Sequence, residues 1–295
     1  FFLFFFKYLS DRDKMNLLLT CKRFIQFIPH VVFTEAYAYD KVQHLNFLHN
    51  IPNLILVSDA KTFTKKELKY VRVLKIKGIF YERISFRQNV FKNLIYLELC
   101  NEFNQTLDYL PPTLLKLKLG HRFNKHIDNL PHSLRVLKLG YWFNRKIDNL
   151  PPKLSELKIN GMFNQPVDHL PPSLLILKLG IRFNHSIDHL PHTLTELDLG
   201  TRFDMPISRL PKHLVKFKIT NSRYHHRITC YPKKLKKLTI MSIMVLENLP
   251  PTLEKLMTGC QDLTDLPKTL RKLVCYNGLD NGVDDLPSDL EYLVL

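Results

Sequence analysis

The chain has 295 residues and a formal net charge of +16, from 43 Lys and Arg against 27 Asp and Glu. Hydrophobic residues make up 45% and charged residues 24%, a composition that excludes an intrinsically disordered chain. No apolar run approaches the ~20 residues that a membrane-spanning helix needs, and the apolar start Phe1 to Phe6 lacks the basic leader and the cleavage site of a signal peptide.

Residues 1–30 are predicted to contain a short helix. Ser10 or Asp11 is a suitable N-cap. Met15, Leu18 and Leu19 follow at nearly helical spacing, which predicts one apolar stripe. We expect this helix either to bind a partner or to shield the end of the domain that follows. Residues 31–70 carry no clear motif and are expected to be a linker or an N-terminal cap.

The helical segment resembles the latter half of an F-box, in which a Leu-Ser-Asp-x-Asp turn leads into a helix ending in Cys-x-Arg-Phe. The matching residues are 9–13 and 21–24, while the first half is cut short or represented only by residues 1–8, and we expect that a segment upstream of residue 1 is missing. The resemblance implies that this segment docks the adaptor of a ubiquitin ligase through Leu9, Met15, Leu17, Leu18, Cys21 and Phe24. The alternative is that residues 1–50 only cap a repeat domain.

Residues 71–295 form a repeat domain, and the repeat is most regular over about 101–220. There, six rows of twenty residues align without a gap, each with Phe, then Asn or Asp, an aliphatic residue, Leu-Pro and Leu-x-x-Leu-x-Leu, in which Ile or Phe replaces Leu in two rows. Degenerate copies continue on both sides, so we expect about a dozen coils. The first five Phe-Asn pairs are Phe103-Asn104, Phe123-Asn124, Phe143-Asn144, Phe163-Asn164 and Phe183-Asn184.

The repeat predicts a mainly β solenoid of leucine-rich-repeat type. The period of two in Leu-x-Leu indicates a strand with one buried face. Proline at the same place in every unit excludes a helix interior and favours extended or polyproline backbone. Too few residues then remain for a helix on the back of each coil. We therefore expect short parallel strands with extended or polyproline backs, preceded by a small helical segment.

The repeated residues are expected to be structural rather than catalytic. Phenylalanine should point into the core that the coils share, and asparagine should hydrogen-bond backbone groups and stack as a ladder. Four glycines that close the strands fit a turn with positive φ; they are Gly120, Gly140, Gly180 and Gly200.

The unit from Phe123 to Gly140 resembles the FNIP repeat, a relative of the leucine-rich repeat in proteins of amoebae and large viruses. The proline usual before the aliphatic residue occurs only as Pro166 and Pro206. FNIP repeats are commonly paired with F-boxes. The resemblance therefore implies a substrate receptor of an SCF-type cullin-RING ubiquitin ligase, in which the F-box docks the adaptor and cullin complex and the solenoid binds a protein target.

No motif for catalysis, a cofactor or a metal is present, and phosphate-loop, dinucleotide, zinc-protease, hydrolase and CxxC patterns are all missing. We expect no enzyme and no cofactor. We interpret His225-His226 as a solvated loop pair rather than as metal ligands. Five scattered cysteines indicate a reducing compartment, so we expect a cytoplasmic protein, in the host cytoplasm if it is viral, with no membrane partner.

The outward residues of the strands are the candidate target-binding face. Lys118, Lys138, Lys158 and Lys178 occupy one column, and Lys218 continues it. Like charges on adjacent strands are unfavourable, so either the lysines splay into water or an acidic target relieves them. Glu156 and Glu196 are nearby counter-charges.

Charge also changes sign along the chain. Residues 211–240 carry nine basic and no acidic residues, whereas residues 241–295 carry four basic and nine acidic residues. This bipolar pattern favours a protein partner over nucleic acid, and aromatic residues are not interleaved with the basic ones on the strand face. The alternatives are a stand-alone repeat scaffold without a role in ubiquitin transfer, or weak nucleic-acid binding through the basic segment.

Overall fold

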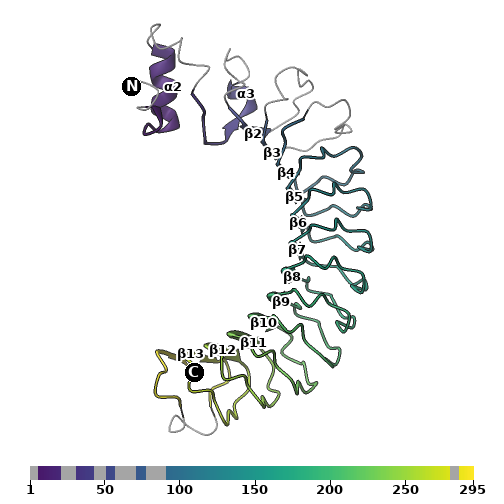
Figure 1. Cartoon of the computed structure of the whole chain (residues 1–295), viewed down its shortest axis with the longest axis vertical. Helices are drawn as coiled ribbons and strands as arrows, with labels where there is room; N and C mark the ends of the chain where they lie inside the picture. Colours follow the sequence, from purple (N-terminus) through teal and green to yellow (C-terminus); the bar gives the residue numbers. More distant parts are fainter. Residues whose placement is uncertain (1–5, 21–30, 43–50, 57–70, 78–90, 280–285) are drawn as a thin grey trace.

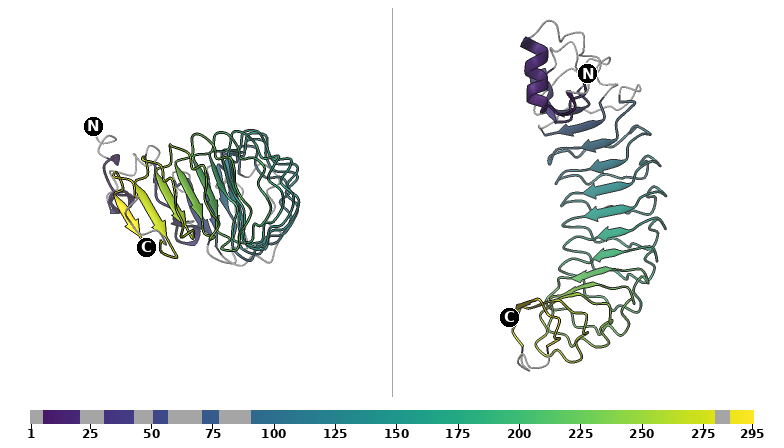
Figure 2. Two further views of the ribbon diagram at one scale, coloured as in Figure 1. Left: turned by 90° about the horizontal axis from the view of Figure 1, so that it is seen from below. Right: turned by 60° about the vertical axis from the view of Figure 1, so that its left-hand side comes forward.

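A computed structural model describes residues 6–20, 31–42, 51–56, 71–77, 91–279 and 286–295 (Figure 1). Its strands form one parallel sheet of fourteen described strands, which follow one another in chain order. The chain bends into an arc whose inner side is lined by the strands (Figure 1). The coils stack side by side along it (Figure 2), so the predicted solenoid of short parallel strands is confirmed.

The described strands are two to four residues long, and the described residues near the N-terminus contain two short helices. The helices are α2 (Asp11–Thr20) and α3 (Tyr39–Val42). The first seven strands are β1 (Tyr37–Ala38), β2 (Asn53–Leu56), β3 (Val73–Ile76), β4 (Tyr96–Glu98), β5 (Lys116–Lys118), β6 (Val136–Leu139) and β7 (Glu156–Ile159). The others are β8 (Ile176–Lys178), β9 (Glu196–Asp198), β10 (Lys216–Ile219), β11 (Lys237–Ile240), β12 (Lys255–Thr258), β13 (Lys272–Cys275) and β14 (Tyr292–Val294).

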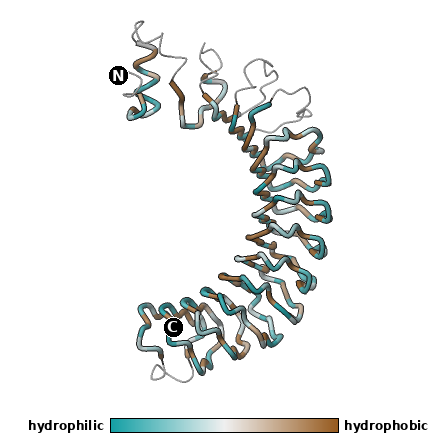
Figure 3. Tube along the Cα trace, in the orientation of Figure 1, coloured by the Kyte–Doolittle hydropathy of each residue, from teal (hydrophilic) through white to brown (hydrophobic). Residues whose placement is uncertain are grey.

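From β3 to β12, each strand alternates buried and outward residues because a strand has a period of two. In β6, Leu137 and Leu139 are buried, whereas Val136 and Lys138 are only partly covered. Hydrophobic and hydrophilic residues are interspersed along the coloured coils (Figure 3). The core runs through the middle of the solenoid, and each coil adds the same few apolar side chains to it.

The back of each coil is built from turns and extended backbone. The amide of Leu134 donates to the carbonyl of Pro131 at 3.0 Å, and Leu154 repeats this bond with Pro151. No helix occurs in the described stretch 91–279, as the twenty-residue period predicts. A hydroxyl links the coils, because Ser133 Oγ donates to the carbonyl of Leu114 at 2.7 Å. The same bond recurs from Thr113, Ser173, Thr193, Thr252 and Thr269.

Phenylalanine and asparagine form two columns along the solenoid. The rings from Phe103 to Phe203 stack with centroids 6.1–6.2 Å apart, and Tyr224 extends the stack at 5.9 Å. In the neighbouring column, the side-chain oxygen of each asparagine accepts a hydrogen bond from the backbone amide twenty residues later. These distances are 2.8–3.1 Å from Asn104 to Asp204. The repeated pair therefore binds neighbouring coils together.

The expected role of the glycines was wrong at three of four positions. Of these four glycines, Gly200 has positive φ, at 77°, whereas Gly120, Gly140 and Gly180 do not. Space explains these three residues instead. A Cβ atom on Gly140 would overlap the carbonyl oxygen of Gly120, and a Cβ on Gly120 would overlap that of Cys100. Glycine is needed here because adjacent backbones come too close for any side chain.

The N-terminal segments join the sheet. β1 and β2 pair in parallel and continue onto β3, so the sheet begins inside the range 31–70 that was expected to be a linker or a cap. Asp11 connects α2 to this end, because its carboxylate accepts hydrogen bonds from the amides of Thr34 and Glu35 at 2.6 Å each. Within the described residues, no helix is both long enough and apolar enough to cross a membrane.

Candidate functional site

The inner face of the arc carries two outward columns of side chains. We call the residue before the central buried residue of each strand the leading column, and the residue after it the trailing column. From β3 to β13 the leading column is Val73, Tyr96, Lys116, Val136, Glu156, Ile176, Glu196, Lys216, Lys237, Lys255 and Lys272. The trailing column is Lys75, Glu98, Lys118, Lys138, Lys158, Lys178, Asp198, Lys218, Thr239, Met257 and Val274.

The trailing column brings the proposed target-binding lysines together. Lys118, Lys138, Lys158 and Lys178 face one another across β5 to β8. Asp198 follows in β9 and is paired in register with Lys218 of β10. Neighbouring strands of a sheet are about 4.8 Å apart, so the four lysines would repel one another if nothing neutralised them.

Acidic residues of the same face neutralise this column. Glu156 lies 2.7 Å from Lys158 and 3.7 Å from Lys138. Lys178 contacts Glu196 at 2.5 Å. The two ends are also paired, because Lys118 lies 2.6 Å from Glu98 and Lys218 lies 3.2 Å from Asp198. The chain thus relieves the repulsion between these lysines without an external partner.

The pKa values of the glutamates reflect these contacts. Burial alone would raise the pKa of Glu156, but hydrogen bonds and positive charge from Lys158 and Lys138 outweigh it and hold the pKa below its usual value. The pKa of Glu196 is lowered in the same way by Lys178 and Lys216, against the effect of burial. Both carboxylates therefore stay charged at neutral pH and bind the lysines together across strands.

The leading column behaves differently near the C-terminus. Lys216, Lys237, Lys255 and Lys272 face one another across β10 to β13, and we call these four residues the C-terminal lysine ladder. Lys216 reaches Glu196 at 3.5 Å. Lys272 Nζ lies 3.9 Å from the centroid of the Tyr292 ring. Lys237 and Lys255 form no ion pair with any residue that the structure describes.

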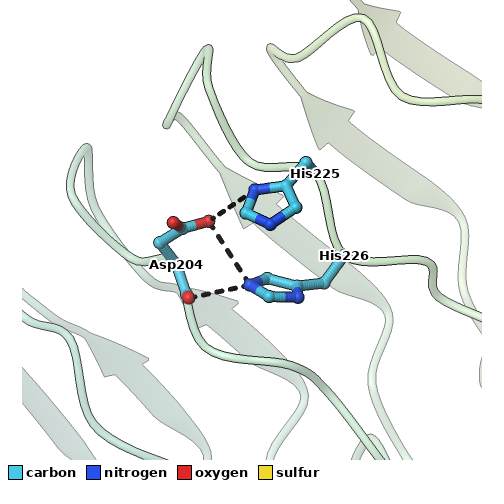
Figure 4. A group of neighbouring side chains, drawn as sticks. All are labelled: Asp204, His225 and His226. Atoms are coloured by element: carbon cyan, nitrogen blue, oxygen red, sulfur yellow. Dashed lines mark hydrogen bonds and ion pairs between the residues drawn. The ribbon is translucent and has the colours of Figure 1, made fainter.

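Asp204, His225 and His226 form a cluster on the edge of the solenoid (Figure 4). Asp204 Oδ1 lies 3.5 Å from His225 Nδ1 and 3.6 Å from His226 Nε2. His226 Nε2 is also 2.9 Å from the backbone oxygen of Asp204. A carbonyl oxygen only accepts, so this nitrogen carries a proton and has no lone pair for a metal ion. In this arrangement the cluster is a hydrogen-bonded junction rather than a formed metal site.

The sequence analysis missed this cluster because Asp204 lies 21 residues before His225 and 22 residues before His226. His225 is exposed, as a solvated loop pair implies, but His226 packs against Tyr224 with ring centroids 5.5 Å apart. The available signal was Asp204, the one acidic residue in the asparagine column. The ladder of hydrogen bonds from backbone amides to side chains ends at Asp204. Asp204 Oδ1 accepts no hydrogen bond from the described residues and has only the longer ion-pair contacts with the two histidines.

The F-box-like residues lie mostly inward. Leu18 is buried in the core, whereas Leu9, Met15 and Leu17 are partly buried against it. Cys21 and Phe24 lie outside the described residues. Ser10 is the N-cap of α2, because its hydroxyl accepts a hydrogen bond from the amide of Asp13 at 3.2 Å. The apolar surface of this segment that a partner can reach is therefore the half-buried edge formed by Leu9, just before α2, and by Met15 and Leu17 of α2.

Sequence comparison identifies the repeat. Residues 103–142, 123–162 and 163–202 match the family profile of the FNIP repeat. A protein of Acanthamoeba polyphaga mimivirus that is provisionally named an F-box protein is 33% identical over 99 residues, 32% of this chain and 42% of that protein. A second mimivirus protein, provisionally named as containing an F-box and FNIP repeats, is 27% identical over 36% of this chain and 23% of its own length. The chain thus matches less than half of either relative.

Solved structures show the same fold. CroV588, a circular leucine-rich-repeat protein, superposes with a TM-score of 0.71 and 28% identity, covering 84% of this chain and 40% of that one. The internalin InlF of Listeria monocytogenes superposes with a TM-score of 0.58 and 18% identity, covering 84% and 81% of the two chains. The chain is therefore a solenoid of leucine-rich-repeat type whose central coils, residues 103–202, are FNIP repeats.

Proposed function

We propose that the protein is a substrate receptor of an SCF-type cullin-RING ubiquitin ligase and acts in the cytoplasm, that of the host if it is viral. The observation that carries the proposal is the order of parts, an F-box-like helix directly before a solenoid of FNIP repeats. Relatives named as F-box proteins support it. Asp11 fixes α2 to the first strands, so a partner bound at the helix would hold the solenoid in a defined orientation.

The two ends of the molecule have different roles in this proposal. The half-buried edge formed by Leu9, Met15 and Leu17 contacts the adaptor, together with Leu18, Cys21 and Phe24 of the same F-box-like segment. The inner face of the arc, including Lys118, Lys138, Lys158, Lys178 and Lys218, holds the target. The chain contributes binding and positioning only, and the other subunits of the ligase carry out the transfer of ubiquitin.

The test is co-purification of the protein, with any upstream coding sequence included, with the adaptor. Leu17→Asp places a charge on the half-buried edge of α2, whereas Arg12→Asp places the same charge on an exposed position of the same helix. Leu18→Asp is unsuitable because Leu18 is buried and its loss would unfold the segment. We expect stable binding that Leu17→Asp abolishes and Arg12→Asp retains, with circular dichroism unchanged in both variants.

Two outcomes would overturn the proposal. One is a folded protein that does not bind the adaptor, which would leave a stand-alone repeat scaffold with α2 as its cap. The other is loss of binding to the same extent in both variants, which would show that the contact does not use the apolar edge of α2.

A further inference from the structure

We infer that the C-terminal lysine ladder, Lys216, Lys237, Lys255 and Lys272, binds an extended acidic segment of a protein partner. The inference deepens the proposed function, because it places the acidic part of the target on β10 to β13. It does not depend on the ubiquitin role, since a scaffold without an F-box would use the same surface.

Two lysines that lack an ion pair and lie in register on adjacent strands distinguish the ladder from the rest of the described inner face. In the trailing column, Lys118, Lys138, Lys158, Lys178 and Lys218 each have an acidic partner within 4 Å. In the ladder, Lys237 and Lys255 have no such partner among the described residues, although they are aligned in register with each other. Like charges in register destabilise a sheet, so a carboxylate that binds between them removes repulsion in addition to forming ion pairs.

The basic residues beside the ladder are already paired. Lys236 lies 2.7 Å from Glu254, and Arg271 lies 3.1 Å from Glu291. The positive charge available to a partner is therefore concentrated in one narrow column. Four lysines on adjacent strands span about 14 Å, three intervals of about 4.8 Å, which an extended segment of roughly five residues covers.

The column beside the ladder is mostly uncharged. The trailing positions of β11 and β12 are Thr239 and Met257, which are partly exposed, and that of β13 is the buried Val274. A segment that alternates acidic and apolar residues would direct its carboxylates to the ladder and lay its apolar side chains along this neutral column. Such a partner uses both columns at once.

A nucleic acid fits this face less well. A phosphate backbone needs a continuous basic track, but Glu196 and Asp198 interrupt the face before the ladder and the exposed Glu291 follows it. A protein segment ends within a few residues and avoids those charges. We therefore assign the ladder to an acidic protein segment.

The test measures binding by fluorescence polarisation of a labelled seven-residue peptide of alternating Glu and Leu. Lys237→Met/Lys255→Met removes the unpaired charges and keeps side chains of similar length. The matched control, Lys233→Met/Lys268→Met, removes the same charge from two exposed lysines of the same coils that lie outside the strands. A Lys-Leu peptide and a single-stranded RNA of ten nucleotides are the comparison ligands.

We expect the acidic peptide to bind, with affinity about tenfold weaker in the ladder variant and less than about twofold weaker in the control, since two exposed ion pairs are lost only in the former. The Lys-Leu peptide should not bind. The inference is overturned if the acidic peptide does not bind, if both variants lose affinity equally, or if RNA binds more tightly and depends on the same two lysines. Urea unfolding of each variant checks that the solenoid is intact, and adaptor binding plays no part in any of these outcomes.

Discussion

The stack of phenylalanine rings predicts that a single truncation in the middle of the solenoid is severe. Phe163 is fully buried, and its ring lies 6.2 Å from those of Phe143 and Phe183. Phe163→Ala removes the ring from between them. Truncating a buried phenylalanine to alanine typically lowers the free energy of unfolding by about 3–5 kcal/mol, because transfer energy is lost and a cavity remains. Coils are stable only when stacked on neighbours, so the defect weakens both adjacent interfaces.

A second variant separates stacking from volume. Phe163→Leu keeps an apolar side chain in the core but loses both ring pairs, each worth about 0.5–1.5 kcal/mol beyond the buried area. We therefore expect a loss of about 1–3 kcal/mol. Trp142→Ala, at a residue that is half exposed, is the surface control and should cost less than about 1 kcal/mol.

Urea unfolding followed by circular dichroism measures all three changes. The expected order of destabilisation is Phe163→Ala, then Phe163→Leu, then Trp142→Ala. A loss below about 1 kcal/mol for Phe163→Ala would show that the coils do not depend on the ring column. Equal stability of Phe163→Leu and the unmodified protein would show that stacking adds nothing to burial.

Three further predictions concern close backbone contact, a buried ion pair and acid. Gly140→Ala should lower the free energy of unfolding by about 1–3 kcal/mol, and with it the urea midpoint, because its Cβ would overlap the carbonyl of Gly120. An unchanged midpoint would show that this close backbone contact does not require glycine. Asp11→Ala leaves Lys14 buried without its partner at 2.8 Å, so hydrogen exchange should become faster over residues 31–36 while residues 103–202 keep their protection. The pKa of Glu156 is lowered from its usual value of 4.5, so its ion pairs stabilise the fold above that pH, and this stability is lost as the pH falls through the folded-state pKa. Between pH 6 and pH 3, the free energy of unfolding should therefore fall less for Glu156→Gln than for the unmodified protein.

The architecture could be predicted from the sequence because its cause is local and repeated. The sequence has a leucine period of two, a fixed proline and a twenty-residue unit. Together these features predict a solenoid without helices on the back of its coils, and the structure shows its sheet of parallel strands in chain order. The FNIP resemblance was likewise carried by one repeated unit and is confirmed over residues 103–202. Both were readable because each coil repeats the same environment.

The features that could not be predicted from the sequence depend on distances between coils. In the sequence, three of the glycines look like ordinary turn glycines at the end of a strand. The structure shows that a Cβ atom at each of them would overlap the backbone of the preceding coil. The lysines of the trailing column were visible, but whether Glu156 reaches Lys158 or Lys138 depends on side-chain geometry across strands. The cluster at Asp204 joins two coils and leaves only a substitution in one column as its trace.

The separation of inward and outward columns has a consequence for how such proteins diversify. From β5 to β10, each coil contributes the same two outward positions to the inner face, while its buried aliphatic residues and its phenylalanine belong to the stack. Duplication of a twenty-residue unit therefore lengthens the molecule without disturbing existing coils, and later substitution at two positions changes what the new coil recognises. Genes built this way can explore many binding specificities on one unaltered frame.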